Sequence, residues 1–209
     1  MFEPSHRTLP WESMLSLVER EKLNWLHQAI RSDSYWREKL YRPKTLDSGT
    51  LEVEGNYHRY LPCSDKNIII RVSRHATKAE LVRVLVAVAQ VGFTLSIHPG
   101  FQLGHQLTDE QLRELMGGDW GRFAIQTEDE FVSAIQKVQP GTKLFVIGAK
   151  EPQLDDLQAN PDLFVIDTPI TKSGRAMQLA FYREQSISIT QHRFGAISSE
   201  LVNIFKPVV

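Results

Sequence analysis

The stretch IIIRVSRHATKAELVRVLVAVAQV, residues 68–91, decides the fold class of this chain. Its first five residues are apolar apart from Arg71, and such a run is typical of a strand that is buried on both faces. Thr77 and Glu80 then stand three residues apart, which is the spacing of a capping box at the start of a helix. The residues that follow are apolar on almost every side, so the sequence predicts a deeply buried helix over 77–91.

The same alternation of strand and helix continues along the chain. Four more short β-prone runs are found at residues 93–97, 122–125, 144–147 and 163–166. Further capping-box patterns begin at Thr108 and Thr127, and the helix expected over 127–138 has one apolar stripe. Buried strands that alternate with helices are typical of a parallel sheet covered on both faces. The sequence therefore predicts an α/β fold, with a Rossmann-like, doubly wound and mostly parallel five-stranded sheet over 67–167.

A helical arm is expected before this sheet and a tail after it. Residues 11–40 show helical spacing of apolar side chains and hold three of the four tryptophans, Trp11, Trp25 and Trp36. We expect this helix to pack on the protein's own core or on a partner. The second role is considered because tryptophan is enriched at interface hot spots. We expect three parts: an arm and linker over 1–56, an α/β domain over 57–170, and a tail with a helix and a β-flap over 171–209.

Two further strand assignments concern the ends of the sheet region. A short pair of strands is expected over 57–61 and 68–72, joined through the turn at 62–67. In the tail, residues 175–185 fit a helix or a strand, and we favour a helix that leads into a strand over 186–190. With no later partner strand, this last strand needs an edge to pair with, in this molecule or in another. The tail therefore indicates assembly.

Composition excludes several classes of function. Lys plus Arg number 24 and Asp plus Glu number 25, for a formal charge of −1, so neither nucleic acid nor an anionic membrane surface is an expected partner. The single cysteine, Cys63, excludes an internal disulfide. The first residues lack the features of a signal peptide, and the longest apolar stretch, 84–89, is too short to cross a bilayer. We expect a soluble, cytoplasmic protein.

Candidate catalytic residues are few. A dinucleotide site needs glycines after the first strand, and the turn over 73–77 has none. Cys63 is the one possible thiol nucleophile, with only Lys66 nearby to lower its pKa. His98 and His105 flank one loop, but no carboxylate or cysteine accompanies them at the spacing of metal ligands. The sequence thus predicts no catalytic residue, no metal site and no cofactor.

The segment Leu179–Ile197 resembles the C-terminal segment of long proline utilization A proteins, which are bifunctional proline dehydrogenase/L-glutamate γ-semialdehyde dehydrogenases. The resemblance rests on the residues REQ at 183–185 and HRFG at 192–195, and upstream on EGNYHRYLP at 54–62 and on the β–α unit after Ile70. It implies a C-terminal domain of the aldehyde dehydrogenase superfamily that is not itself catalytic. In that family the domain's β-flap packs against the aldehyde dehydrogenase module and helps to cover the cavity through which the intermediate passes.

The resemblance implies an interaction or assembly domain whose partner is a proline dehydrogenase/aldehyde dehydrogenase-type protein or a second copy of the chain. The expected contact residues are Arg183, Glu184, Gln185, Ser186, Ile187, Ile189, His192, Arg193 and Gly195. The alternative is a fragment of an NAD-dependent L-glutamate γ-semialdehyde (1-pyrroline-5-carboxylate) dehydrogenase, or another nucleotide-binding oxidoreductase. Only under that alternative is NAD an expected cofactor.

Overall fold

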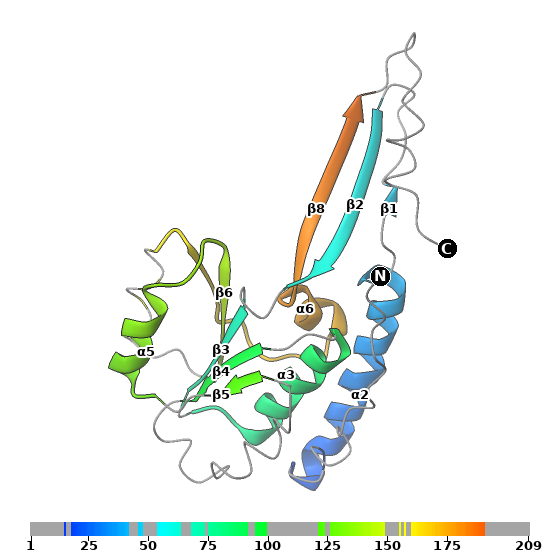
Figure 1. Cartoon of the computed structure of the whole chain (residues 1–209). Helices are drawn as coiled ribbons and strands as arrows, with labels where there is room; N and C mark the ends of the chain where they lie inside the picture. Colours follow the sequence, from blue (N-terminus) through cyan, green and yellow to red (C-terminus); the bar gives the residue numbers. More distant parts are fainter. Residues whose placement is uncertain are drawn as a thin grey trace.

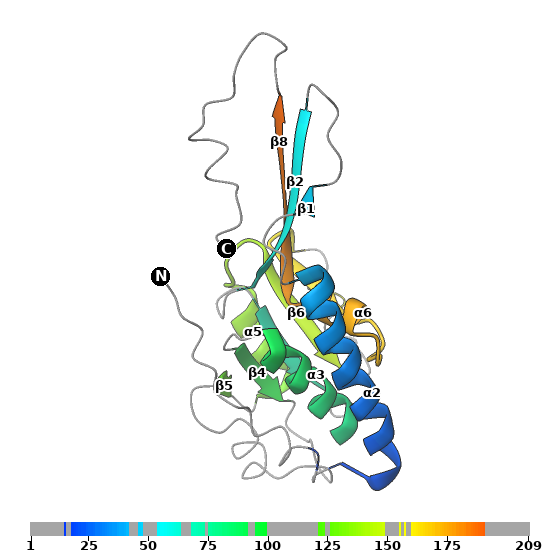
Figure 2. The same ribbon diagram turned by 90° about the vertical axis from the view of Figure 1, so that its right-hand side faces the viewer.

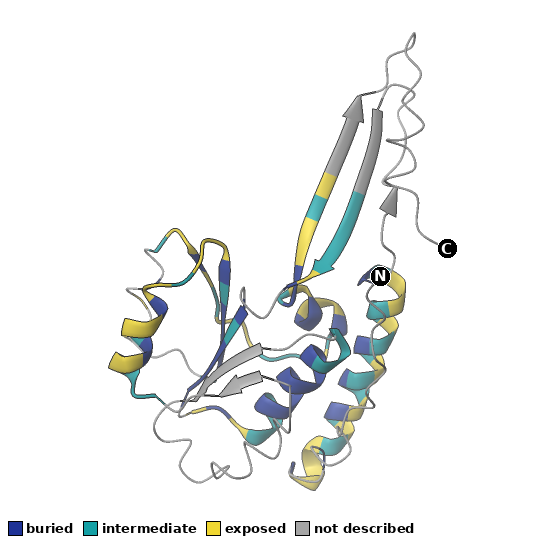
Figure 3. Cartoon of the chain, in the orientation of Figure 1, coloured by how far each residue is buried: buried dark blue, intermediate teal, exposed yellow. Residues whose placement is uncertain are grey.

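The computed structural model combines an α/β body with an antiparallel ribbon that projects from one end of it (Figure 1). The residues that the structure describes are 15, 18–41, 46–47, 54–63, 68–73, 75–91, 95–99, 121–123, 126–148, 155, 157 and 160–190. Buried residues gather in the body, around its sheet and helices (Figure 3). The fold is thus α/β, with one parallel and one antiparallel sheet.

The body is built on a parallel sheet, which has five strands in the described part of the chain. In chain order these are β3 (Ile68–Val72), β4 (Leu95–Pro99), β5 (Gly121–Phe123), β6 (Thr142–Ile147) and β7 (Leu163–Ile166). Across the sheet they run β5-β4-β3-β6-β7, and every neighbouring pair is parallel. β3 is central, which explains why its sequence is apolar without interruption except at Arg71.

Helices cover both faces of this sheet. On one face α3 (Lys78–Val91) packs against Ile68, Ile70 and Val72 of β3. On the other face, the neighbouring Ile69 packs into a second core with Phe131 and Ile135 of α5 (Glu128–Ile135). Since side chains alternate along a strand, the central strand supplies both cores.

Arg71 is the one charged side chain of β3, and it is buried on the α5 side. Its Nη2 lies 2.8 Å from Oε2 of Glu128, and its guanidinium lies 4.5 Å from the centre of the Phe131 ring. The ion pair and the cation–π contact compensate the charge in the core.

The capping boxes at the starts of α3 and α5 form as expected. The backbone N–H and the hydroxyl of Thr77 both donate to Glu80 Oε2, at 2.8 and 2.9 Å, and the Glu80 N–H donates back to Thr77 Oγ1. Thr127 and Glu130 repeat this pattern with the same two distances. The third predicted box, at Thr108, lies outside the described residues.

The N-terminal arm packs on the protein's own core. Helix α2 (Arg20–Trp36) continues as a short π-helix, η1 (Arg37–Tyr41), and buries Leu26 and Ala29. It lies beside α3 and α6 (Gly174–Leu179), as Figure 2 shows. Trp25 contacts the main core, and the Arg175 guanidinium lies 5.3 Å from the Trp36 ring. Of the two roles considered for this helix, these contacts support internal packing.

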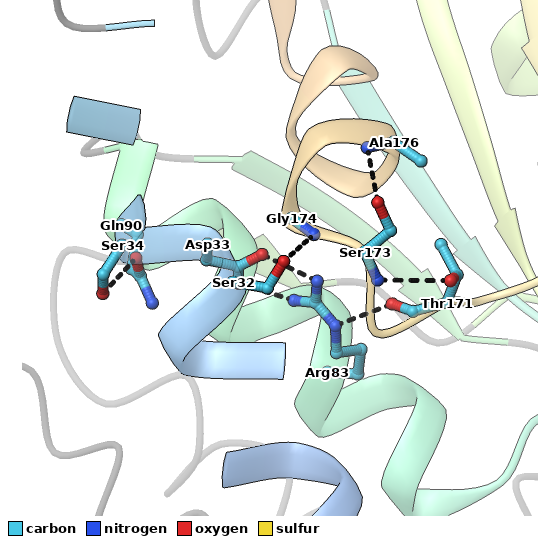
Figure 4. A network of polar contacts seen from close by, with 9 residues as sticks. All are labelled: Ser32, Asp33, Ser34, Arg83, Gln90, Thr171, Ser173, Gly174 and Ala176. Atoms are coloured by element: carbon cyan, nitrogen blue, oxygen red, sulfur yellow. Dashed lines mark hydrogen bonds and ion pairs between the residues drawn. The ribbon is translucent and has the colours of Figure 1, made fainter. Parts of the chain in front are cut away.

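A buried polar network joins α2, α3 and the start of α6 (Figure 4). Arg83 donates from Nη1 and Nη2 to the two carboxylate oxygens of Asp33, each at 2.7 Å, and from Nε to the Thr171 carbonyl at 2.9 Å. Burial raises the pKa of Asp33, and the charge of Arg83 opposes that effect. The Gly174 N–H donates to Ser32 Oγ, and a Cβ at Gly174 would lie 2.5 Å from the Ser32 carbonyl oxygen. Only glycine permits this close approach.

The ribbon consists of the two long strands β2 (Glu54–Pro62) and β8 (Tyr182–Thr190), with the short β1 (Leu46–Asp47) beside β2. β2 and β8 pair antiparallel over their full length, from Glu54 opposite Thr190 to Pro62 opposite Tyr182. The order of the sheet is β1-β2-β8, so no strand in the described ranges lies outside β8.

Two expectations were wrong here. The segments 57–61 and 68–72 do not pair with each other, because β2 and β3 belong to different sheets. The helix in the tail ends at Leu179, and residues 182–185 are already strand. Both errors have one cause: pairing with β2 satisfies the backbone of 182–190, and local periodicity cannot reveal a distant partner. The division at 56/57 and 170/171 stays a prediction, although β2 crosses the first boundary.

Candidate functional site

The ribbon carries most of the contact residues predicted from sequence. Arg183, Glu184 and Ser186 are exposed on β8, and Gln185 is half-buried. Ile187 and Ile189 also lie in β8, opposite Tyr57 and Gly55 in the pairing register. His192, Arg193 and Gly195 lie outside the described residues.

One face of the ribbon holds a cross-strand cluster around His58. Its Nε2 lies 2.6 Å from Glu184 Oε1, and its Nδ1 lies 3.1 Å from Ser186 Oγ. The His58 and Tyr60 rings meet nearly edge to face, with centroids 5.1 Å apart. These four residues come together because alternate positions of two paired strands share a face.

The opposite face of the ribbon carries a different polar contact. Arg59 Nε donates to Gln185 Oε1 at 2.5 Å, and the two residues stand directly opposite each other in the register. Arg183 stands opposite Leu61 on this face. Each face is thus held by side chains from both strands.

An aromatic cluster fixes the root of the ribbon to the helical arm. The Tyr41 and Tyr182 rings are stacked, with centroids 4.5 Å apart and planes 6° from parallel, and Tyr60 meets Tyr41 edge-on at 5.1 Å. The Tyr41 hydroxyl donates to the Arg175 carbonyl at 2.6 Å. Burial raises the pKa of Tyr182 to about 12 and also raises that of Tyr41.

A second set of contacts fixes the root to the parallel sheet. Lys143, near the start of β6, donates from Nζ to the carbonyls of Ala180 and Tyr182, at 3.1 and 2.5 Å. The ring of Phe145 in β6 stacks on that of Phe181, with centroids 5.4 Å apart, and the Cys63 N–H continues the pairing of the ribbon's own strands by donating to the Phe181 carbonyl at 2.9 Å. The root therefore lies at the amino ends of the parallel strands. Ligands of α/β folds usually bind at the opposite, carboxyl ends.

Cys63 itself is a buried thiol between the two sheets. Burial raises its pKa, and the charges of Lys143 and Arg183 oppose this effect. A protonated, buried thiol is a poor nucleophile. Cys63 therefore serves packing at the ribbon root.

The turn from β3 to α3, at the carboxyl end of the sheet, is closed by its own contacts. The Ser73 N–H donates to the Ile147 carbonyl at 2.9 Å, and Ser73 Oγ accepts from the His75 N–H at 3.2 Å. Gly148, with φ of +89°, packs so closely that a Cβ there would lie 2.5 Å from Ser73 Oγ. The Glu80 carboxylate accepts a hydrogen bond from the N–H of Thr77, the residue before α3, and so places a negative charge beside the first turn of the helix.

A cavity of about 690 Å³ lies between the N-terminal ends of α2 and α3. Val18, Trp25 and Ile170 contribute apolar walls, and charged side chains from both helices line the rest. His98 lies in β4 with its backbone opposite Arg71, whereas His105 is outside the described residues. Within the described ranges, no group of three or more His, Cys, Asp and Glu side chains is arranged to hold a metal ion. None of the helices described there is both long and apolar enough to span a bilayer.

Sequence reasoning missed His58, Lys143 and the three tyrosines of the root. The segment 54–62 carries part of the resemblance to proline utilization A proteins, but its role as the partner of β8 depends on pairing across most of the chain. The alternation of His58 and Tyr60 with Arg59 and Leu61 is the one local signal of a two-faced strand.

Comparisons with known proteins support the fold. No protein-family model matches the chain, and no curated protein matches its sequence. Among solved structures, a proline utilization A from Corynebacterium freiburgense has a TM-score of 0.54 and 22% identity over 94% of this chain. Histidinol dehydrogenase from Elizabethkingia anophelis (TM-score 0.46, 12% identity, 81% of this chain and 40% of that one) is also similar. So is a mutant proline utilization A from Bradyrhizobium japonicum (TM-score 0.44, 13% identity, 65% of this chain and 15% of that one). This chain spans only 16% of the Corynebacterium protein, and its fold is similar to a part of that protein.

Proposed function

We propose that this chain is a non-catalytic interaction domain of the kind found at the C-terminus of long proline utilization A proteins. Its docking segment is the ribbon formed by β2 and β8. Its partner is a proline-catabolic aldehyde dehydrogenase or a second copy of the chain. The observation that carries the proposal is a long ribbon that projects from the body while its root is held by packed and hydrogen-bonded residues. The fold similarity to the Corynebacterium protein supports it.

The edge of the ribbon suits docking. In the described part of the chain β8 has a neighbour on one side only, so its outer side carries main-chain groups that a partner strand can bind. Arg183 and Glu184 stand exposed beside that edge and supply opposite charges for orientation. A rigid root lowers the entropic cost of binding, because the ribbon is already in its final shape.

The parallel sheet acts as the scaffold in this proposal. We infer a Rossmann-like layer, because its five strands follow the order 3-2-1-4-5 of doubly wound sheets. At both α3 and α5 the first helical turn is capped by a glutamate of the same helix. A carboxylate beside the first turn repels a phosphate there, and this supports a structural role for the layer.

The proposal is tested by binding of the full chain to a purified proline-catabolic aldehyde dehydrogenase, with light scattering to measure self-association. The variant Arg183→Ala/Glu184→Ala removes the exposed pair on β8. Glu21→Ala/Lys22→Ala is a matched control, since it removes an adjacent, exposed and oppositely charged pair from α2. We expect the β8 variant to weaken association by at least about tenfold, and the control to leave it unchanged. Association with neither partner, or equal weakening by both variants, contradicts the proposal.

A nucleotide-binding oxidoreductase remains the second candidate. The strand order and the cavity beside the first turn of α3 favour it. Calorimetric titration with NAD separates the two functions. Binding at micromolar concentration supports the oxidoreductase, and heat no greater than that of dilution supports the interaction domain.

A further inference from the structure

Three polar side chains on one face of the ribbon form a hydroxyl–imidazole–carboxylate series. His58 stands directly opposite Ser186 in the register, and Glu184 occupies the diagonal position on the same face. Ser186 Oγ lies 3.1 Å from His58 Nδ1, and Glu184 Oε1 lies 2.6 Å from His58 Nε2. Both distances fall within the range that joins a nucleophile to its base and a base to its orienting group.

The donors and acceptors in this series follow from the chemistry of the groups. An ionised carboxylate can only accept hydrogen bonds, so the proton of a neutral His58 ring belongs on Nε2, facing Glu184. Nδ1 then carries the lone pair. Ser186 must donate its hydroxyl hydrogen to that lone pair, which is the arrangement of a serine and its general base.

We propose that Ser186 is a nucleophile with His58 as its general base and Glu184 as the residue that positions His58, and that small activated carboxylic esters acylate it. Ser186 Oγ attacks the carbonyl carbon while its proton passes to His58 Nδ1. The C–O bond to the leaving group breaks, the alcohol leaves with that proton, and an acyl-Ser186 ester remains. Water hydrolyses this ester with the same base. This reactivity goes beyond the proposed function and does not rest on it.

The exposure of the site sets the class of substrate. Ser186 and Glu184 are exposed, and the cavity between α2 and α3 is lined by other residues. Substrates are therefore selected by their reactivity rather than by their shape, which favours small esters with good leaving groups. General-base assistance contributes about 10²–10⁴-fold.

The test is acetylation of the full chain by 4-nitrophenyl acetate, followed by the release of 4-nitrophenolate and by peptide mapping of the acetylated residue. Ser186→Ala removes the nucleophile, and His58→Gln removes the base. Ser188→Ala is a matched control, because position 188 lies two residues further along the same strand. We expect Ser186 to be acetylated at least about tenfold faster in the parent and in Ser188→Ala than in His58→Gln. Equal rates in the parent and in His58→Gln, or acetyl groups on lysines alone, overturn the proposal.

Glu184 has its own readout, which a purely structural role does not move. The ¹⁵N shifts of the His58 ring report which nitrogen carries the proton. We expect the Nε2-protonated tautomer in the parent chain and a mixture in Glu184→Ala, with slower acetylation of Ser186. A ring whose tautomer is the same in both proteins contradicts the assigned role, and circular dichroism shows whether each variant keeps its fold.

Discussion

Asp33 and Arg83 show how strongly a single buried charge constrains this molecule. Both side chains are fully buried, and each satisfies the other through two short hydrogen bonds. Asp33→Ala leaves the Arg83 cation without its partner in the core. We expect a loss of about 3–5 kcal/mol in the free energy of unfolding, measured by urea denaturation. Glu38→Ala, which removes the exposed partner of Arg37, should cost less than about 1 kcal/mol. Similar losses in the two variants would contradict this account of the pair.

Gly174 is constrained by space rather than by charge. A Cβ at this position would lie 2.5 Å from backbone atoms of Ser32 and Asp33, so α6 must move away from α2 in Gly174→Ala. We expect this variant to be less stable by about 1–3 kcal/mol in thermal or urea unfolding. Ala176→Ser adds one atom to an exposed site of the same helix and should change stability by no more than about 0.5 kcal/mol. An unchanged free energy of unfolding in Gly174→Ala would contradict this account, because it would mean that α6 can move away from α2 without cost.

Tyr182 links stability to alkaline pH. Burial raises its pKa from about 10 to about 12 in the folded protein. As pH rises past 10, the phenol of the unfolded chain ionises first, so this contribution to stability is complete below pH 10 and is lost as pH rises through 12. Between pH 8 and 12, the free energy of unfolding should therefore fall less steeply with pH for Tyr182→Phe than for the parent chain. Tyr35→Phe alters an exposed phenol, and its free energy of unfolding should change with pH as that of the parent does. The same pH dependence in the parent and in both variants would contradict the argument.

At the scale of elements, Lys143 supplies polar contacts that join the ribbon to the parallel sheet. Its ammonium donates to two carbonyls at the turn between α6 and β8. In Lys143→Met these acceptors lose a charged donor, which is worth about 1.5–3 kcal/mol. We expect amide hydrogen exchange over 180–186 to speed up by at least about tenfold, while β3 and β6 keep their protection. Lys172→Met removes an exposed contact with Gln28 and should leave 180–186 unchanged. Faster exchange throughout the sheet would show instead a general loss of stability.

Elements set by nearby residues could be predicted from the sequence. The run 68–72 is a buried strand because its side chains face cores on both sides, and the capping boxes at Thr77 and Thr127 need only residues three positions away. The partner of β8 could not be predicted, because pairing of 54–62 with 182–190 depends on the packing of everything between them. The cluster of His58, Glu184 and Ser186 depends on that register, so it was hidden for the same reason.

At the scale of the whole molecule, the two long strands of the ribbon stand on either side of the body in the sequence. A ribosome delivers β2 early, and β8 only after every strand of the parallel sheet has been made. The body can therefore fold during synthesis, before β8 is available to pair with β2. The ribbon can form only after the whole parallel sheet has been translated. A nascent or prematurely terminated chain without β8 therefore cannot present the ribbon to a partner.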